Sequence, residues 1–443
     1  MGTEAIGLSG RQNLDVLATE MYELATQLFP ICRSITGEGV RETLRLVGAH
    51  APLDVHEVTT GTPAFDWTVP REWNIKDAYI RNAAGERVVD FRHSNLHVMG
   101  YSIPVRARMT LEELRPHLHS LVDQPDWIPY RTSYYTDDWG FCVSHRQLAG
   151  LEDGEYEVFI DSTLEDGALT YGELLLPGES RDEILLHTHV CHPSLANDNV
   201  SGIACNAFLA RILSTYRLRY SYRFVFVPGT IGALVWLSRN TDHLADIRGG
   251  IVVNNVGDRG TFSYKRSRRG DATIDRAASH VLTRRDADSR ISDFSPFGYD
   301  ERQYCSPGFD LPVGAFSRSS HGMFPEYHTS ADNLDLVQPA AMAESLATLL
   351  DIIEVIEGDG CYENLSPYGE PQLGRRGLYR AVGGAADLET SQLALLWVLN
   401  LSDGGHSLLD IVERSGLEFT VVRDAAHALA ENGLLTPVSN QSS

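Results

Sequence analysis

Apolar residues recur along the chain with two spacings, and the spacing changes from segment to segment. Between residues 13 and 29, Leu14, Leu17, Met21, Leu24 and Leu28 fall on one side of a helix. Between about residues 155 and 355, short apolar runs of strand length alternate with longer amphipathic stretches. The expected strands are 155–162, 171–178, 182–190, 222–229, 249–257 and 311–318, and the expected helices are 201–216, 232–240, 271–285 and 339–358. Such alternation predicts an α/β domain with a mixed sheet and helices on both faces.

Two other segments have different patterns. Residues 51–150 combine alternating β-branched residues, many aromatic side chains and closely spaced turn signals, which predicts an inserted β-rich domain. Residues 361–443 predict helices and a final short strand, the outline of a winged helix. We expect residues 1–50 and 151–360 to form the α/β domain. The aromatic side chains of the insert that we expect to pack within it are Phe65, Trp67, Trp73 and Trp139.

The acidic composition limits the partners that the chain can bind. The chain has 443 residues, with 37 Lys and Arg against 60 Asp and Glu, so its formal net charge is −23. A surface this acidic repels phosphate backbones and anionic lipid. We therefore expect a small molecule or a short peptide as substrate, and neither nucleic acid nor a membrane as partner. We also expect the protein to form a homo-oligomer.

The cysteines and the first residues indicate a reducing compartment. The six cysteines are widely scattered and form no C-x-x-C pair, which argues against a zinc ribbon, a redox pair or a disulfide framework. The segment "MGTEAIGLSGRQNLD" has no basic-then-apolar signal pattern. These features predict a cytoplasmic protein.

Metal-binding residue types gather where a predicted strand ends. The strand within 182–190 leads into "HTHVCHPSLANDNVSG", with His189 at the strand tip and Asp198 before the next helix. Asp258 and His328 follow later strands. Because the carboxyl ends of parallel strands meet at one edge of a sheet, these side chains can converge. A single histidine at a strand end, or a single aspartate before a helix, more often has a structural role than a catalytic one. Here all of these side chains are expected at the same edge of the sheet, and this favours a zinc site.

Several segments together carry a resemblance to a known family. "HTHVCHPSLANDNVSG", "VFVPGTIGALVWL", "VGDRG", "GYDERQYCSPGFDLPV" and "PEYHTSADNLD" resemble the aminopeptidase-like proteins of bacterial polysaccharide and secondary-metabolite gene clusters. These proteins are distant relatives of zinc aminopeptidases and glutaminyl cyclases. The resemblance covers nearly the whole chain. It implies the zinc-aminopeptidase-like (phosphorylase/hydrolase-like) fold, with the β-rich insert and the terminal winged helix.

The resemblance also implies metal ligands. The family's strand-tip histidine falls on His189, its bridging aspartate on Asp198, its later aspartate on Asp258 and its final histidine on His328. An acidic partner of the family is replaced here by Cys191, and the adjacent His192 is a candidate to supply a polar group. We expect one zinc ion rather than two, with Asp258 as a second ligand or as a partner of the ligands. Asp332 is expected to orient the ring of His328.

The chain departs from the wider family at the position of its adjacent glutamates. There the sequence reads "VFVPGTIG", and Gly229 stands where an acid is expected. Hydrolysis needs a group that takes a proton from water and delivers it to the leaving amine. The candidates for this role are Glu326, Glu301 and His321. For Glu326, a surface ion pair is an equally good explanation.

Cationic and phenolic side chains are candidates for substrate binding. Arg318, Tyr304 and Tyr327 lie in the same segments, and a guanidinium can bind a substrate carboxylate through two hydrogen bonds. The run "YKRSRRGD" contains further arginines, for which a solvated loop is the better explanation. Those arginines are Arg266, Arg268 and Arg269.

Three functions are compatible with these observations. The first is a zinc-dependent aminopeptidase-like hydrolase that cleaves an amide or peptide bond of a small amine-bearing substrate in a biosynthetic pathway. The second is a zinc-dependent amide-forming or cyclising enzyme on the same scaffold. The third is a non-catalytic winged-helix interaction protein. The segment 417–433 carries one arginine and several acids, so we expect poor contact with DNA. The metal-binding pattern favours the hydrolase.

Overall fold

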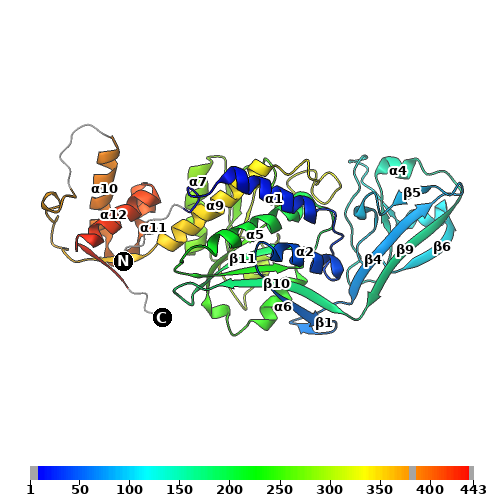
Figure 1. Ribbon diagram of the computed structural model, residues 1–443, viewed down its shortest axis with the longest axis horizontal. Helices are drawn as coiled ribbons and strands as arrows, with labels where there is room; N and C mark the ends of the chain where they lie inside the picture. The colour runs from blue at the N-terminus through cyan, green and yellow to red at the C-terminus, as the bar shows by residue number, and fades with distance from the viewer. Residues whose placement is uncertain (1–7, 379–385, 439–443) are drawn as a thin grey trace. The chain divides into compact units, whose positions relative to one another are not determined.

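The computed structural model describes residues 8–378 and 386–438, which fall into two compact units. One unit comprises residues 12–275 and 285–348, and the other comprises residues 1–11, 276–284 and 349–443. The first unit contains the α/β sheet and the β-rich segment, and the second contains the C-terminal helices (Figure 1).

The first unit is built around an eight-stranded mixed sheet. Its order is β1-β10-β12-β11-β13-β16-β14-β15. The centre of the sheet is parallel, with β11 between β12 and β13 and with β16 next to β13. The strands are β1 (Asp54–Thr59), β10 (Ala168–Leu176), β11 (Glu183–His189), β12 (Ser221–Val227), β13 (Ile247–Val253), β14 (Ser263–Lys265), β15 (Arg290–Ser292) and β16 (Val313–Ser317). The parallel centre places the carboxyl ends of four strands at the same edge, as the alternating pattern predicts.

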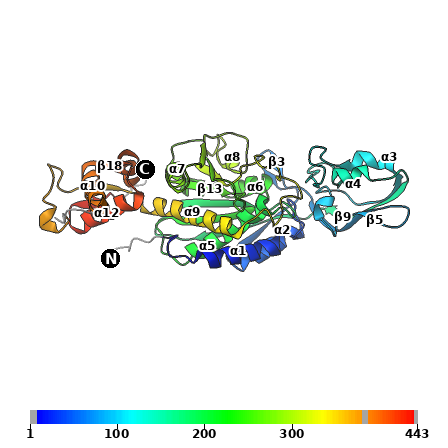
Figure 2. The same cartoon turned by 90° about the horizontal axis from the view of Figure 1, so that it is seen from above.

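Helices cover both faces of this sheet. α1 (Leu14–Leu28) and α5 (Gly202–Leu213) lie on one face, and α6 (Ile231–Arg239) and α8 (Glu301–Tyr304) lie on the other (Figure 2). Every residue of β11 is buried, because the strand is sandwiched between two helical layers. α2 (Glu38–Gly48) belongs to the same unit, and the residues of α7 (Thr273–Arg285) and α9 (Pro339–Gly358) are divided between the two units. The predicted fold class is confirmed.

The β-rich segment forms a separate four-stranded antiparallel sheet of order β5-β4-β9-β6. Its strands are β4 (Glu72–Arg81), β5 (Arg87–Asp90), β6 (Val105–Thr110) and β9 (Glu155–Glu165). Around it lie β2 (Pro63–Ala64), β3 (Trp67–Thr68), α3 (Leu111–Leu114), β7 (Leu118–His119), β8 (Phe141–Cys142) and α4 (His145–Ala149). Residues 54–59, which we expected in the insert, pair with β10 in the large sheet instead. Residues 155–165, which we expected in the α/β sheet, pair with β4 and β6.

The aromatic residues of this segment divide into two groups. Trp73 is buried, and the ring of Trp139 stacks on His117 with 3.7 Å between the ring centroids. Phe65 and Trp67 remain 51% and 43% exposed. Trp67 meets Tyr135 of the β-rich segment edge to face, as expected, although the short hairpin of β2 and β3 leaves its ring partly at the surface. Packing within the β-rich domain is the wrong expectation for Phe65, whose ring meets Phe309 of the α/β domain instead.

The second unit contains the expected winged helix. Its helices are α10 (Ala386–Leu401), α11 (Leu408–Ser415) and α12 (Phe419–Glu431). Its antiparallel sheet has the order β18-β17-β19, from Asp403–Ser407, Cys361–Asn364 and Leu435–Pro437. Leu409, Val412, Val422 and Leu429 are fully buried between the helices. The amphipathic spacing in this segment thus encodes a small helical core.

Two global features agree with the composition. Over residues 8–378 and 386–438, the structure contains no helix that is both long and apolar enough to cross a bilayer. All six cysteines are free thiols, as expected for a chain with no disulfide framework.

The start of α11 offers a test of the winged-helix unit. Ser407 and Asp410 form a capping box, in which each side chain accepts a hydrogen bond from the other's backbone N–H. Replacing Ser407 by alanine removes one acceptor from the helix start, so Ser407→Ala is expected to destabilise α11 by about 1 kcal/mol. Hydrogen exchange of the α11 amides should accelerate roughly fivefold. Arg414→Gln, on an exposed position of the same helix, should leave that exchange unchanged.

Candidate metal centre and its cavity

The end of β11 and the loop after it carry the candidate site. β11 ends at His189, and a tight turn of Ala196–Ser201 precedes α5. Asp198 lies within this turn with a fully buried side chain, and its peptide bond to Asn199 is cis. The turn brings the carboxylate back over the strand tip, although the two residues are nine positions apart.

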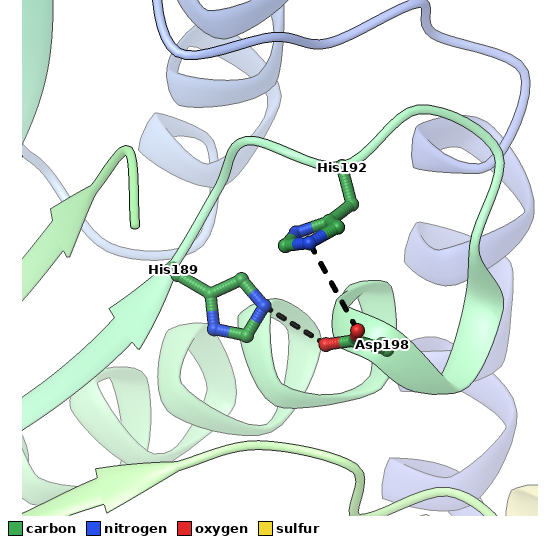
Figure 3. A group of neighbouring side chains, drawn as sticks. All are labelled: His189, His192 and Asp198. Atoms are coloured by element: carbon green, nitrogen blue, oxygen red, sulfur yellow. Dashed lines mark hydrogen bonds and ion pairs between the residues drawn. The ribbon is translucent and has the colours of Figure 1, made fainter. Parts of the chain in front are cut away.

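Three imidazoles surround the Asp198 carboxylate. His189 Nε2 lies 2.9 Å from Asp198 Oδ1, and His328 Nε2 lies 3.0 Å from Oδ2. His192 Nε2 lies 4.0 Å from Oδ2. Figure 3 shows His189 and His192 pointing at the carboxylate from the strand tip and from the loop. The ligand atoms of His189, His192 and Asp198 all lie within 4.8 Å of one another, a spacing that could hold a metal ion.

The electrostatics of this cluster favour the protonation states that metal binding requires. Burial opposes ionisation of Asp198, but the imidazoles of His192, His189 and His328 outweigh this effect and hold its pKa well below the usual range. Burial lowers the pKa of His192 to about 3, so this ring is neutral. A carboxylate with neutral imidazoles is the form in which these side chains bind divalent metals.

Asp332 holds the Asp198 loop in place. Its carboxylate accepts hydrogen bonds from the backbone N–H groups of Asn197 and Asp198, at 2.6 and 2.9 Å. Burial, together with the charge of Asp198, raises the pKa of Asp332 to about 8, although these N–H donors work against the rise. We expected Asp332 to orient the His328 ring, but its carboxylate binds the loop backbone instead. The His328 ring stacks on Tyr327, with 4.0 Å between centroids.

Asp258 also supports the loop, through hydrogen bonds that both of its carboxylate oxygens accept. Asp258 Oδ2 accepts a hydrogen bond from Asn197 Nδ2 at 2.6 Å, and Oδ1 accepts one from Ser319 Oγ at 2.8 Å. The backbone N–H of Gly260 donates a third. Asp258 therefore binds Asn197, the residue next to Asp198. It does not belong to the group of His189, His192 and Asp198 that could hold a metal ion.

The two glutamates that we considered as proton acceptors lie outside the cavity. Glu301 is completely buried at the start of α8, where its carboxylate pairs with Lys265. Glu326 is half-buried, and its backbone carbonyl accepts hydrogen bonds from Thr329. Neither residue lines the cavity beside His189.

Two of the expected substrate-binding residues are engaged elsewhere. The guanidinium of Arg318 donates to Ser345 Oγ and to the Gly260 carbonyl, and it pairs with Glu344. Tyr304 is buried beneath the site, with its hydroxyl 2.9 Å from His187 Nδ1. These side chains stabilise the scaffold and do not line the cavity.

The exposed arginine run behaves as a solvated loop. Arg266 pairs with Asp293, and both Arg268 and Arg269 pair with Asp310. These ion pairs agree with the prediction that the three arginines belong to a solvated loop and do not bind substrate.

A cavity of about 410 Å³ lies over the cluster. His189, His192 and His328 line it, and both His321 and Tyr327 from the expected set line it as well. Tyr130 to Thr132 and Tyr134 of the β-rich segment complete the wall, so the cavity is formed by residues far apart in the sequence. Burial raises the pKa of Tyr327 far above its usual value, which keeps its hydroxyl protonated.

Asp300 is a residue of the site that we did not predict from the sequence. Its Oδ2 lies 3.0 Å from Nε2 of the buried His187, and its Oδ1 accepts a hydrogen bond from the Thr230 backbone at 2.8 Å. Burial works to raise the pKa of Asp300, but the hydrogen bond with His187 keeps it below the usual value. The sequence did contain a signal for such a residue. His187 lies on the same face of the strand as His189, and a buried imidazole needs a hydrogen-bond partner.

Gly229 lies between Asp300 and the metal cluster. A Cβ at this position would lie 3.7 Å from His189 Cβ, 3.9 Å from Asp300 Oδ2 and 3.2 Å from Cys191 Sγ. A longer side chain here would enter the cavity, so the glycine leaves the Asp300 carboxylate next to the space beside His189.

Comparison with known proteins identifies the family. The model of the domain of unknown function DUF4910 matches residues 22–359, and a winged helix-turn-helix model matches residues 360–437. A Clostridium acetobutylicum protein, provisionally named a polysaccharide biosynthesis protein with an aminopeptidase-like domain, is 52% identical over 424 residues, which cover 96% of this chain and 98% of the relative.

Solved structures agree with this assignment. A crystal structure from Clostridium acetobutylicum, provisionally named a peptidase, superposes with a TM-score of 0.92 at 50% identity, over 96% of this chain and 98% of that one. A zinc aminopeptidase from Bacillus subtilis superposes with a TM-score of 0.54 at 12% identity, over 76% of this chain and 94% of that one, which shows a shared fold. The chain therefore belongs to the DUF4910 family, and it combines an aminopeptidase-like α/β fold with a C-terminal winged helix.

Proposed function

We propose that the protein is a zinc-dependent hydrolase that cleaves an amide bond of a small amine-bearing substrate in a biosynthetic pathway. The observation that carries this proposal is the group of three imidazoles around the buried Asp198 carboxylate, at the base of a cavity. The name of the Clostridium acetobutylicum relative supports the biosynthetic setting.

The donor set fits a single zinc ion. Zinc in proteins is bound by imidazole nitrogens and carboxylate oxygens, and a catalytic site keeps one position open. His189, His192 and Asp198, whose ligand atoms lie within 4.8 Å of one another, would hold the ion, and His328, which lies outside that group but 3.0 Å from Asp198 Oδ2, would be a further donor. Asp258, whose carboxylate binds Asn197 and Ser319, would orient the Asp198 loop. When bound, zinc would polarise the amide carbonyl and lower the pKa of a water molecule.

Asp300 is the carboxylate that we propose as proton acceptor. It lines the same cavity as His189, whereas Glu301 and Glu326 do not. Against the effect of burial, the hydrogen bond with His187 lowers the pKa of Asp300 and keeps the carboxylate ionised, so it would be the proton acceptor of the cavity that takes a proton from the attacking water and delivers it to the leaving amine. His187, fixed by the Tyr304 hydroxyl, holds this carboxylate in position.

The phenols of the cavity wall would orient the substrate. Burial raises the pKa of both Tyr299 and Tyr327 far above the usual value, so their hydroxyls remain hydrogen-bond donors. The Tyr327 ring stacks on His328, so the phenol lies next to the metal-binding cluster. Such fixed donors stabilise charge that develops on a carbonyl oxygen during hydrolysis.

Metal content tests the donor set directly. The purified protein should bind about one zinc ion per chain by elemental analysis. Asp198→Ala should lose nearly all of this zinc, because it removes the carboxylate that contacts two imidazoles. Asp258→Asn should retain most of it, because position 258 acts through Asn197. Retention of zinc by Asp198→Ala, or two ions in the unaltered protein, would contradict the assignment.

Amine release from a panel of aminoacyl amides and N-acylated amino sugars tests the proton acceptor. Asp300→Asn keeps the side-chain shape but removes the basic oxygen, so it should lower the rate of amine release by about 10²–10⁴-fold. Its zinc content should stay unchanged. Glu326→Gln is the matched control and should retain activity. A rate loss in Glu326→Gln that is absent in Asp300→Asn would reverse the assignment.

A further inference from the structure

A second and larger cavity opens directly beside the metal cavity. It has a volume of about 830 Å³, and Ile35, Tyr134, Gly229 and Thr230 line both cavities. Volumes of this order accommodate small organic ligands. Because Gly229 has no side chain, the wall shared with the metal cavity is thin next to His189. A ligand in the larger cavity could therefore extend a substituent to the metal cluster.

Two half-exposed aromatic rings line this larger cavity. Trp67 is 43% exposed and Tyr135 is 50% exposed. The rings meet edge to face with 5.6 Å between centroids, and the Tyr135 hydroxyl donates to the Thr68 carbonyl at 3.2 Å. These contacts hold the two rings against each other, and their remaining faces can cover an apolar ring surface of a ligand.

The charged groups of this cavity are all cationic. Arg268 and Arg302 line it, and no aspartate or glutamate is among its described lining residues, although the whole chain has a net charge of −23. Arg268 is neutralised by Asp310 at 2.9 Å. Arg302 forms no ion pair with another of the described residues, so its guanidinium is the cationic group of this wall that is left to bind an anionic ligand.

We infer that the larger cavity binds a sugar acid, whose ring packs on Trp67 and Tyr135 and whose carboxylate is bound by Arg302. A guanidinium binds a carboxylate through two parallel hydrogen bonds. Gln303 and Ser306, which also line the cavity, supply donors and acceptors for ring hydroxyls. This inference rests on the proposed function, because the N-acyl amide of the sugar then extends past Gly229 to the metal cluster.

Calorimetric binding to the zinc-free full-length protein tests this subsite separately from hydrolysis. N-Acetylneuraminate, which has a pyranose ring, a carboxylate and an amide, is the probe, and N-acetylglucosamine is the comparison without a carboxylate. The sugar acid should bind at least about tenfold more tightly, as expected for a charge-assisted hydrogen-bonded pair. Arg302→Gln should abolish this preference. Trp67→Ala should weaken both sugars, and both variants should keep the wild-type melting temperature.

Arg269→Gln is the matched control, because Arg269 is an exposed arginine that pairs with Asp310 and does not line this cavity. It should bind the sugar acid within twofold of the unaltered protein. Equal binding of the two sugars, unchanged binding by Arg302→Gln, or tighter binding of N-acetyltyrosine than of the sugar acid would overturn the inference. Binding of the sugar acid without amine release from the zinc-loaded protein would contradict the proposed hydrolysis and leave the subsite established.

Discussion

The buried carboxylate of Asp198 is the group on which the site depends. A carboxylate without solvent is unfavourable unless neighbouring groups compensate for its charge. Here two imidazole nitrogens lie within about 3 Å of its oxygens, and a third is 4.0 Å away. The three histidines come from a strand tip, from the following loop and from a segment more than 100 residues later. The carboxylate therefore ties the sheet edge, the turn before α5 and the segment around His328 into one arrangement.

The surrounding structure keeps this carboxylate in place. Asp332 binds two backbone N–H groups of the Asp198 turn, and Asp258 binds Asn197. Each of these acids therefore acts on the loop and neither contacts the imidazoles. The consequence for chemistry is a single compact donor set, with Gly229 beside it. That glycine makes room for Asp300 on one side and for the larger cavity on the other.

Much of the fold and part of the site could be predicted from the sequence. The alternation of strand-length and helix-length runs predicts the α/β sheet, and parallel strands place His189, Asp198 and His328 at one edge. The roles of Asp258, Asp332 and Arg318 could not be read in this way, because they depend on which backbone or side-chain groups lie within reach after folding. Asp300 was missed for the same reason, since its partner His187 lies 113 positions away. Phe65 was expected to pack within the β-rich domain, yet the short hairpin that carries it leaves the ring half exposed against Phe309.

The most direct test of the account is the zinc coordination shell measured by X-ray absorption at the zinc edge of the metal-loaded protein. We expect the zinc ion to have only nitrogen and oxygen neighbours, with multiple-scattering features from at least two imidazoles. We expect no second zinc ion nearby. A sulfur neighbour at about 2.3 Å would assign Cys191 as a ligand. That result, or the signal of a second zinc ion at short distance, would contradict a single ion held by imidazoles around Asp198.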